Sequence, residues 1–386
     1  MVAFVLPVLT NAVSQTHRLY SFSFCHGFCR SDGAMKYLQK KSRSRRCSYQ
    51  HHRSERKTQI EMVNESMDTN TIHSAVVTGA SPGSIGFEVV RGILRSFPQA
   101  TVYLGLRSED GNMNQSILDT LLEQFPHSTP VIVSLPLHDI EKVFHAANTI
   151  ENHIRQNTDP QFHALDLLVN CAGVMACEEA KTVQGYEYQF GVNHLGHAAL
   201  TEGLLPLLRM SKRPGQGRIV CVSSIAALGG FPGYEILRNK NFEAYTGSSF
   251  LSFGKYDRWK AYVDSKLANA GFAKGLNELE NGNVTAVSVH PGIVASRLQR
   301  HLAPSLSQDS AQLKRAVKYL PIKNVEEGAR NSIQAALCAT TSLDRRGDLY
   351  IGDSTPSWFS LDSRICRDFA RRSLTEVRKF KPQSRS

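Results

Sequence analysis

Long apolar runs are missing from this sequence. No window of about 18 or more consecutive apolar residues occurs in the 386-residue chain, and a helix needs about 20 to cross a bilayer. We therefore expect no membrane span, although peripheral membrane contact is compatible with the sequence. Internal repeats are absent as well, which argues against a repeat architecture.

Paired cysteine spacings are also missing. The chain has eight cysteines, none at the spacing of a zinc site, so we interpret them as reduced thiols of an intracellular protein. His194 and His197 are three residues apart, but no carboxylate or cysteine accompanies them at ligand spacing. We expect no metal site.

Acidic residues are scarce at the start of the chain. Residues 1–60 hold 11 Lys and Arg against Asp32 and Glu55, so the leader carries +9 of the total net charge of +11. It is rich in Ser and Arg, which is typical of an organelle transit peptide. We predict that residues 1–70 are a transit peptide or a disordered basic leader, addressed to the chloroplast or, alternatively, to the mitochondrion.

Two other interpretations of the leader are weighed against this one. A true start at Met62 or Met67 would leave the protein in the cytoplasm. A nucleic-acid-binding arm would need base-reading partners in the rest of the chain, and these are missing, so we expect no nucleic-acid partner.

From residue 71 onward, short apolar runs alternate with helical patterns. Such runs are typical of parallel strands that are buried on both faces. The sequence predicts an α/β fold over residues 71–386, a single Rossmann-type, doubly wound parallel sheet of about seven strands with helices on both faces. The expected strands are 74–78, 101–106, 131–135, 165–170, 218–222, 283–289 and 349–351. The expected helices include 140–154, 185–210 and 325–340.

A glycine-rich turn follows the first expected strand. Gly79, Gly83 and Gly86 stand between that strand and a helical pattern. Glycines let a ligand phosphate approach the backbone, and the start of a helix offers free N–H groups to an anion. Arg107 ends the second strand, where a cation would meet a 2′-phosphate, so NADP is preferred over NAD.

A tyrosine and a lysine lie four residues apart in a segment with no Pro or Gly. Helical geometry places the ammonium of Lys266 near the phenol of Tyr262, where a cation would lower the phenol's pKa. This pairing is that of a proton donor with its activator. The alternative is an exposed helix that contains both residues by chance.

Three further features surround this pair. Asn193 lies inside an apolar helical pattern, where it either packs with its hydrogen bonds satisfied or distorts the helix to hold a water. Ser224 follows the fifth strand, at the sheet edge where α/β proteins bind ligands. An aromatic-rich insertion at about 228–258 forms either an apolar wall over a cleft or a packed surface loop.

Taken in order, these motifs resemble the short-chain dehydrogenase/reductase family. The resemblance covers about residues 73–355 and rests on Thr78-Gly79 with its glycine turn, Asn170-Cys171-Ala172-Gly173, Asn193, Ser223-Ser224, Tyr262 to Lys266 and Pro291-Gly292. Further motifs look like the branch of retinol dehydrogenases, WW-domain oxidoreductases and light-dependent protochlorophyllide reductases. We rank the retinol dehydrogenase side first.

The resemblance implies a catalytic set. In it Ser224 hydrogen-bonds the substrate oxygen and Tyr262 exchanges the proton. Lys266 lowers the phenol pKa and holds the nicotinamide ribose, while Asn193 positions a water. The implied cofactor-binding residues are Gly79, Ser81, Gly83, Ile85, Gly86, Arg107, Asn170, Ala172, Gly173, Tyr262, Lys266, Pro291, Gly292, Val294 and Ser296.

The implied function is interconversion of a carbonyl and an alcohol on a large apolar substrate, such as a retinoid-like, lipid or pigment intermediate. NADPH is the expected cofactor. The segment at about 297–320 is expected to form a lid over the substrate. The resemblance also admits a homodimer, formed through the helices that flank the tyrosine. One alternative is a plastid enzyme resembling the light-dependent protochlorophyllide reductases, and another is a non-catalytic NAD(P)-binding sensor or scaffold.

Two departures from the family pattern favour that last alternative. The glycine turn has one residue more than usual between Gly83 and Gly86, and Pro136 stands where many members carry an aspartate that contacts adenine. Neither departure touches the expected catalytic set.

Overall fold

The computed structural model describes most of the chain beyond the leader. The described residues are 71–107, 111–157, 159–160, 163–213, 217–230, 234–248, 253–295, 298, 322–338, 349–351 and 360–382. The chain divides into two units, Met1–Thr71 and Ile72–Ser386, and the sheet, its helices and the candidate site all belong to the second. The predictions for the leader, for Ser296 and for nearly all of the lid at 297–320 lie outside the described residues.

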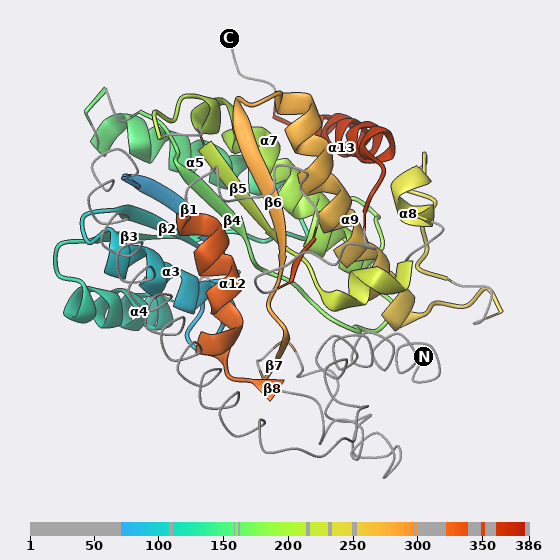
Figure 1. Ribbon diagram of the computed structural model, residues 1–386, viewed down its shortest axis with the longest axis horizontal. Helices are drawn as coiled ribbons and strands as arrows, with labels where there is room; N and C mark the ends of the chain where they lie inside the picture. The colour runs from blue at the N-terminus through green and yellow to red at the C-terminus, as the bar shows by residue number, and fades with distance from the viewer. Residues whose placement is uncertain are drawn as a thin grey trace, which may run out of the picture. The chain divides into compact units, whose positions relative to one another are not determined.

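A seven-stranded sheet forms the centre of the second unit (Figure 1). Its order is β3-β2-β1-β4-β5-β6-β9, and every neighbouring pair is parallel. The predicted doubly wound α/β sheet is therefore confirmed. The strands are β1 (Ser74–Thr78), β2 (Thr101–Leu106), β3 (Thr129–Ser134), β4 (Leu167–Asn170), β5 (Gly217–Val222), β6 (Val284–His290) and β9 (Leu349–Ile351).

Helices cover both faces of the sheet and create two hydrophobic cores. On one face pack α3 (Ile85–Ser96), α4 (Gly111–Gln124) and α12 (Val325–Leu337). On the other pack α5 (Ile140–Asn157), α7 (Gly196–Arg209), α9 (Arg258–Glu280) and α13 (Ser363–Arg378). The strand order reverses between β1 and β4, and ligands bind at such switch points, beyond the carboxyl ends of the strands.

The helix predicted over 185–210 is interrupted. It consists of a short α6 (Tyr188–Phe190), a π-helical turn η3 (Gly191–Leu195) and α7. Asn193 lies in the π-helical turn, and its side chain bonds to the backbone of Val174. A π-helical turn accommodates one extra residue, and this one coincides with the position from which Asn193 reaches the neighbouring loop.

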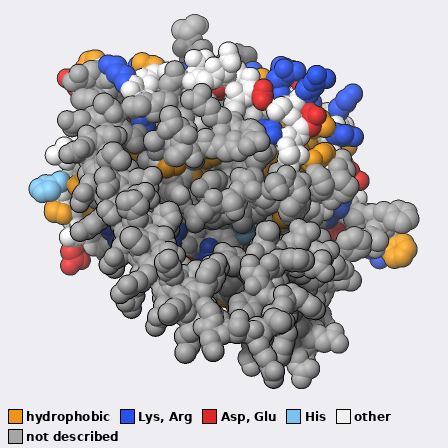
Figure 2. Space-filling model, in the orientation of Figure 1, with side chains coloured by type: hydrophobic (Ala, Val, Ile, Leu, Met, Phe, Trp, Pro, Cys, Tyr) orange, Lys and Arg blue, Asp and Glu red, His pale blue; other side chains and the backbone are white. Residues whose placement is uncertain are grey.

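The C-terminal helix α13 was not predicted; the sequence indicated only a basic tail. Asp362 caps its start by accepting hydrogen bonds from two backbone N–H groups, and its apolar side chains are buried against α7 and α9. Lys and Arg gather on its exposed side (Figure 2), and Arg367, Arg371 and Arg378 are each about half exposed. Among the helices that the structure describes, none combines the length and apolar character that a bilayer crossing requires.

A second, two-stranded parallel sheet was also not predicted. It pairs β7 (Ile293–Val294), just after β6, with β8 (Ile322–Lys323), just before α12. The described parts of the insertion contain a 3₁₀ turn η4 (Ile225–Gly230) and the short helix α8 (Glu235–Arg238). These elements surround the carboxyl ends of β5 and β6.

Candidate active site

The predicted helix around Tyr262 and Lys266 is confirmed as α9. Asp257 caps it by accepting hydrogen bonds from the N–H groups of Trp259 and Lys260. Tyr262 and Lys266 are buried, with 5% and 3% of their surface exposed. The Lys266 Nζ lies 5.8 Å from the centroid of the Tyr262 ring and donates to the Val222 carbonyl oxygen at 3.1 Å, at the end of β5.

The pKa of the phenol differs from the sequence-based prediction. Burial raises the pKa of Tyr262 to about 12, and a hydrogen bond with Ser224 opposes the rise. Burial also lowers the pKa of Lys266 to about 8. The expected acidification of the phenol by the ammonium is therefore not found, because the ammonium is directed at the Val222 carbonyl and burial dominates. At neutral pH the phenol keeps its proton, as a proton donor requires.

The two serines after β5 have different roles. Ser223 is buried, and its hydroxyl donates to the Lys266 carbonyl oxygen at 2.6 Å, which ties the strand end to α9. Ser224 is half buried, and its hydroxyl accepts from the Ala226 N–H at 3.2 Å and shares a hydrogen bond with Tyr262. Of the two serines, Ser224 is therefore the one positioned beside the phenol.

Asn193 is fully buried and its side chain is satisfied by protein partners. The Oδ1 accepts from the Val174 N–H at 2.8 Å, while the Nδ2 donates to the Val174 carbonyl oxygen and to the Ser265 hydroxyl, both at 2.9 Å. The residue thus joins the loop after β4 to α9. The structure combines the two alternatives considered from the sequence, a packed amide and a distorted helix.

The glycine turn is closed on one side and open on the other. A Cβ on Gly79 would lie 2.8 Å from the Cα of Ala172, and one on Gly86 would lie 2.7 Å from the Gly79 carbonyl oxygen. Gly83, at φ +75°, faces open space. A side chain would not fit at Gly79 or Gly86, whereas room remains in front of Gly83, so the turn fits a dinucleotide phosphate.

The additional residue in this turn acts as the helix cap. The Ser84 hydroxyl donates to the Gly79 carbonyl oxygen at 2.7 Å and accepts from the Phe87 N–H at 3.1 Å. Ile85 and Gly86 follow it in the first turn of α3, and their N–H groups have no acceptor within the described part of the chain. The longer turn therefore keeps backbone donors available for an anion.

Comparison with known proteins decides the family. Residues 73–236 match the model of short chain dehydrogenases. Human retinol dehydrogenase 12 is 32% identical over 291 residues, which cover 75% of this chain and 80% of that protein. The chain belongs to the short-chain dehydrogenase/reductase family. It is therefore an NAD(P)-dependent oxidoreductase, and the resemblance to the retinol dehydrogenase branch is confirmed.

One further relative and one solved structure match this chain over most of their own length. The short-chain dehydrogenase TIC 32 A, chloroplastic, of Brassica napus is 29% identical over 319 residues, covering 79% of this chain and 88% of that protein. L-sorbose reductase from Gluconobacter frateurii, solved in complex with NADPH and L-sorbose, has a TM-score of 0.53 and 19% identity, covering 74% of this chain and 96% of that one. The match to the L-sorbose reductase structure supports the assigned fold, but not a function.

The other residues predicted to bind the cofactor lie in several loops around the carboxyl edge of the sheet. Gly173 lies beside Asn193 and Lys266, since a Cβ there would come within 3.1 Å of the Asn193 Oδ1 and 3.4 Å of the Lys266 Nζ. Asn170 instead faces α7, where its Nδ2 donates to the Thr201 hydroxyl at 3.2 Å. The other described members are Ser81, in the glycine turn; Arg107, exposed after β2; Ala172, against Gly79; Pro291 and Gly292, after β6; and Val294, in β7.

Sequence reasoning missed three polar residues that connect these loops. The Thr78 hydroxyl accepts from the N–H groups of Cys171 and Ala172, each at 2.9 Å, and also contacts the Nε2 of His197 at 2.9 Å. His290 accepts through Nδ1 from the backbone N–H groups of the turns after β5 and β6. Thr78 directly precedes Gly79 and His290 directly precedes Pro291, and these positions beside known motif residues could have indicated their roles.

The two histidines that were weighed as metal ligands contact different partners. The Nε2 of His194 lies 2.9 Å from the Ser373 hydroxyl on α13, whereas His197 contacts Thr78. Burial lowers the pKa of His194 to about 3 and that of His197 to about 4, so both are neutral. A search of the described residues found no group of three or more His, Cys, Asp and Glu that could hold a metal.

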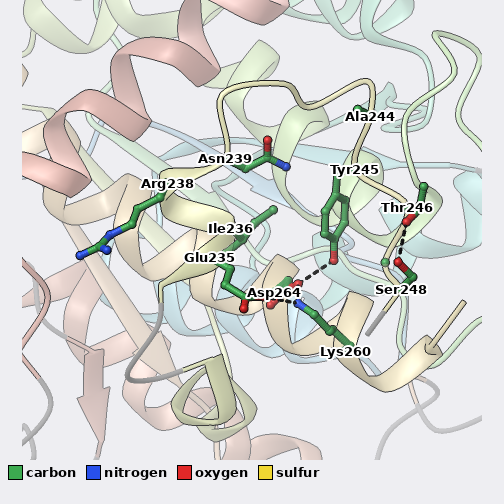
Figure 3. A pocket seen from close by; sticks show the side chains of 11 residues that line it. Glu235, Ile236, Arg238, Asn239, Ala244, Tyr245, Thr246, Ser248, Lys260 and Asp264 are labelled. Carbon is green, nitrogen blue, oxygen red and sulfur yellow. Dashed lines mark hydrogen bonds and ion pairs between the residues drawn. The ribbon is translucent and has the colours of Figure 1, made fainter. Parts of the chain in front are cut away.

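The described insertion residues pack against α9 and line an open pocket of about 520 Å³ (Figure 3). Within it, Tyr245 donates to Asp264 at 2.8 Å, and Lys260 pairs with Asp264 at 2.5 Å. Phe242 is buried in the core. Residues 260 and 264 lie on a different face of α9 from Tyr262. For these residues the structure favours the packed loop over the apolar wall.

Proposed function

We propose that this protein is an NADP-dependent reductase that converts the carbonyl of a large apolar molecule into an alcohol. The observation that carries the proposal is the Tyr262 phenol, which burial keeps protonated and which a hydrogen bond joins to Ser224 beside Lys266. A protonated phenol is the form that gives a proton to a reduced carbonyl.

The chemistry needs a hydride and a proton. When bound, a nicotinamide cofactor supplies the hydride to the carbonyl carbon. The hydroxyls of Ser224 and Tyr262 hydrogen-bond the carbonyl oxygen, where negative charge develops, and the Tyr262 proton moves to that oxygen. Burial outweighs the Lys266 ammonium in the resting site, but once the proton has moved, that ammonium, 5.8 Å from the ring centroid, attracts the phenolate. Asn193 holds the loop after β4 against α9 and so fixes the distance between them.

The preference for NADP rests on Arg107 at the end of β2, exposed and available to a 2′-phosphate. In the Arg107→Leu variant we expect the dissociation constant for NADPH to rise about tenfold and that for NADH to stay unchanged, as loss of one charge-assisted contact implies. Fluorescence titration of both nucleotides measures this. Arg95→Leu, which removes another exposed arginine from α3, is the control, and an equal loss for both nucleotides would contradict the assignment.

The substrate class is supported by the 32% identity to a retinol dehydrogenase. Purified protein beginning at Met62 should oxidise NADPH in the dark when given retinaldehyde or another long apolar aldehyde. Nucleotide binding without turnover of any carbonyl would support the sensor alternative and refute the proposal.

A second candidate is a light-dependent reductase of protochlorophyllide. The run Tyr262-Val263-Asp264-Ser265-Lys266 and a relative named as chloroplastic favour it. The same assay, run with protochlorophyllide in darkness and under illumination, separates the two. Turnover that requires light would replace the first candidate with this one.

We also propose that the protein acts in the chloroplast, because the leader has a transit-peptide composition and one relative is named as chloroplastic. A fusion of residues 1–70 to a fluorescent protein should enter plastids in plant cells. Mitochondrial or cytosolic fluorescence would refute this localisation and support one of the two alternatives.

A further inference from the structure

The turn after β6 holds a lysine from a distant part of the sequence. Gly292 has φ +91°, a conformation that favours glycine. The side chain of Lys323, from β8, lies over it, so that a Cβ on Gly292 would come within 3.0, 3.1 and 3.2 Å of the Cδ, Cε and Nζ of Lys323. The β7–β8 pairing, with the Ala295 N–H donating to the Lys323 carbonyl oxygen at 3.0 Å, fixes this position.

A titratable neighbour of this ammonium, His290, is neutral. The Nδ1 of His290 accepts from the Ile225 N–H at 3.1 Å and from the Gly292 N–H at 3.3 Å, so the ring proton is on Nε2. Burial and the charge of Lys323 lower the pKa of His290 to about 4. The turn therefore carries the single positive charge of Lys323.

No carboxylate pairs with Lys323 among the residues that the structure describes. Lys323 is half buried, and the Gly292 turn on which its side chain lies comes two residues after His290, whose Nδ1 also accepts from the Ile225 N–H in the loop that carries Ser224. A partly buried cation that no described carboxylate neutralises can be satisfied by an anion from a ligand.

We propose that Lys323 binds an oxyanion at the Gly292 turn. This proposal rests on the proposed function. The oxyanion is either the nicotinamide-side phosphate of the dinucleotide, which we place first, or a carboxylate on the substrate. The Lys323 ammonium donates to the oxyanion, while the turn held by His290 sets its distance from Ser224.

The test compares Lys323→Met and Lys323→Arg with the wild-type full chain by calorimetric titration of two probes. NADPH carries both phosphates of the diphosphate, whereas adenosine 2′,5′-bisphosphate lacks the nicotinamide-side phosphate. For Lys323→Met we expect the dissociation constant for NADPH to rise about tenfold, less at high salt, and that for the bisphosphate to stay unchanged. Lys323→Arg should retain most of the NADPH affinity.

Other outcomes separate the sources and the proposals. If the NADPH affinity is unchanged but KM rises for a carboxylate-bearing aldehyde relative to its methyl ester, the substrate is the source. The proposal is overturned if Lys323→Met loses affinity for NADPH and for the bisphosphate equally. It is also overturned if neither affinity and neither KM changes. Lys142→Met, at an exposed position on α5, is the control for loss of a positive charge, and thermal unfolding checks the fold. If the wild-type protein binds no NADPH, the proposed function is refuted. The role of Lys323 is then tested by comparing binding of the carboxylate-bearing aldehyde with binding of its methyl ester.

Discussion

His290 connects the two turns that border the catalytic residues. Its Nδ1 accepts from Ile225, next to Ser224, and from Gly292, in the turn after β6. The Nδ2 of Asn331 on α12 donates to the His290 carbonyl oxygen at 2.7 Å, which fixes the residue from the other side. His290 is therefore a positioning residue that acts through Ser224.

We expect His290→Phe and His290→Asn to differ. Phenylalanine leaves two partly buried N–H groups without their acceptor, at a cost of up to about 1–3 kcal/mol each, and so should reduce kcat about tenfold or more. Asparagine places an oxygen near the position of Nδ1 and should restore most of kcat. Steady-state kinetics of both variants, with thermal unfolding alongside, measures this. Equal activities of the two variants would contradict the positioning role.

Lys266 and Tyr262 give a pH dependence with a definite sign. Burial lowers the pKa of Lys266 to about 8, so its positive charge is present below that pH and is lost as the pH rises through it. Tyr262, with a pKa of about 12, stays protonated throughout. We therefore expect kcat/KM for carbonyl reduction to fall above about pH 8.

The measurement is a pH–rate profile of the wild type and of Lys266→Arg. An arginine keeps its charge beyond the measured range, so any residual activity of that variant should not fall near pH 8. A wild-type profile that stays level from pH 6 to pH 10 would show that the charge of Lys266 does not support the reaction.

Short-range spacing made part of the catalytic set predictable from the sequence. Tyr262 and Lys266 are four residues apart on one helix, and Ser224 directly follows a strand, so local geometry indicated their place. Thr78 and His197 are 119 residues apart, and their contact depends on how β1 packs against α7. The pKa of Tyr262 depends on burial by the whole domain, and for that reason its direction was predicted wrongly.

At the scale of elements, α9 and α13 approach each other closely beside the site. A Cβ on Gly275 of α9 would lie within 2.1 Å of the Cys366 carbonyl oxygen of α13 and within 2.7 Å of the Ala370 Cβ. Only glycine permits this approach, and α13 in turn supports the helix that carries Tyr262.

Gly275→Ala should therefore destabilise the protein. Forcing α13 away from α9 should cost about 1–3 kcal/mol and lower Tm by several degrees, as overpacking a core does. Gly111→Ala is the matched control, because a Cβ at that start of α4 would meet nothing within 4 Å. Differential scanning calorimetry measures both, and an unchanged Tm for Gly275→Ala would contradict the close packing.

The elements also show where sequence patterns fail. Strands and α9 were predicted because buried apolar runs and uninterrupted helix formers are local signals. In α13 the apolar residues Phe369, Leu374 and Val377 follow helical spacing behind the cap of Asp362, but the many arginines obscured that pattern. The π-helical turn at Asn193 depends on partners in the loop after β4 and in α9, so no local signal announced it.

At the scale of the whole molecule, α13 covers the face that the sequence-based expectation assigned to a homodimer. It packs against α9, which carries Tyr262, and against α7, and its outward side carries Arg364, Arg367, Arg371 and Arg378. Asp368 pairs with Arg367 and Arg371, and Glu202 pairs with Arg378, but the arginines outnumber these acids, and the remaining positive charge opposes a second copy.

We therefore predict that the protein does not dimerise through the α7–α9 face. Light scattering at micromolar concentration should give the mass of one chain. Arg367→Glu with Arg371→Glu should leave that mass unchanged, since neither side chain touches the core. A dimer that dissociates on this charge reversal would contradict the prediction and show that the outward face of α13 forms the interface.

We propose that the fold as a whole presents one buried, protonated phenol to a carbonyl at the carboxyl edge of the sheet. The most direct measurement is NADPH binding and carbonyl-dependent NADPH oxidation by Tyr262→Phe. We predict an NADPH dissociation constant close to that of the wild type and a loss of turnover of about a thousandfold. Normal NADPH oxidation by this variant, with any carbonyl that the wild type reduces, would contradict the account.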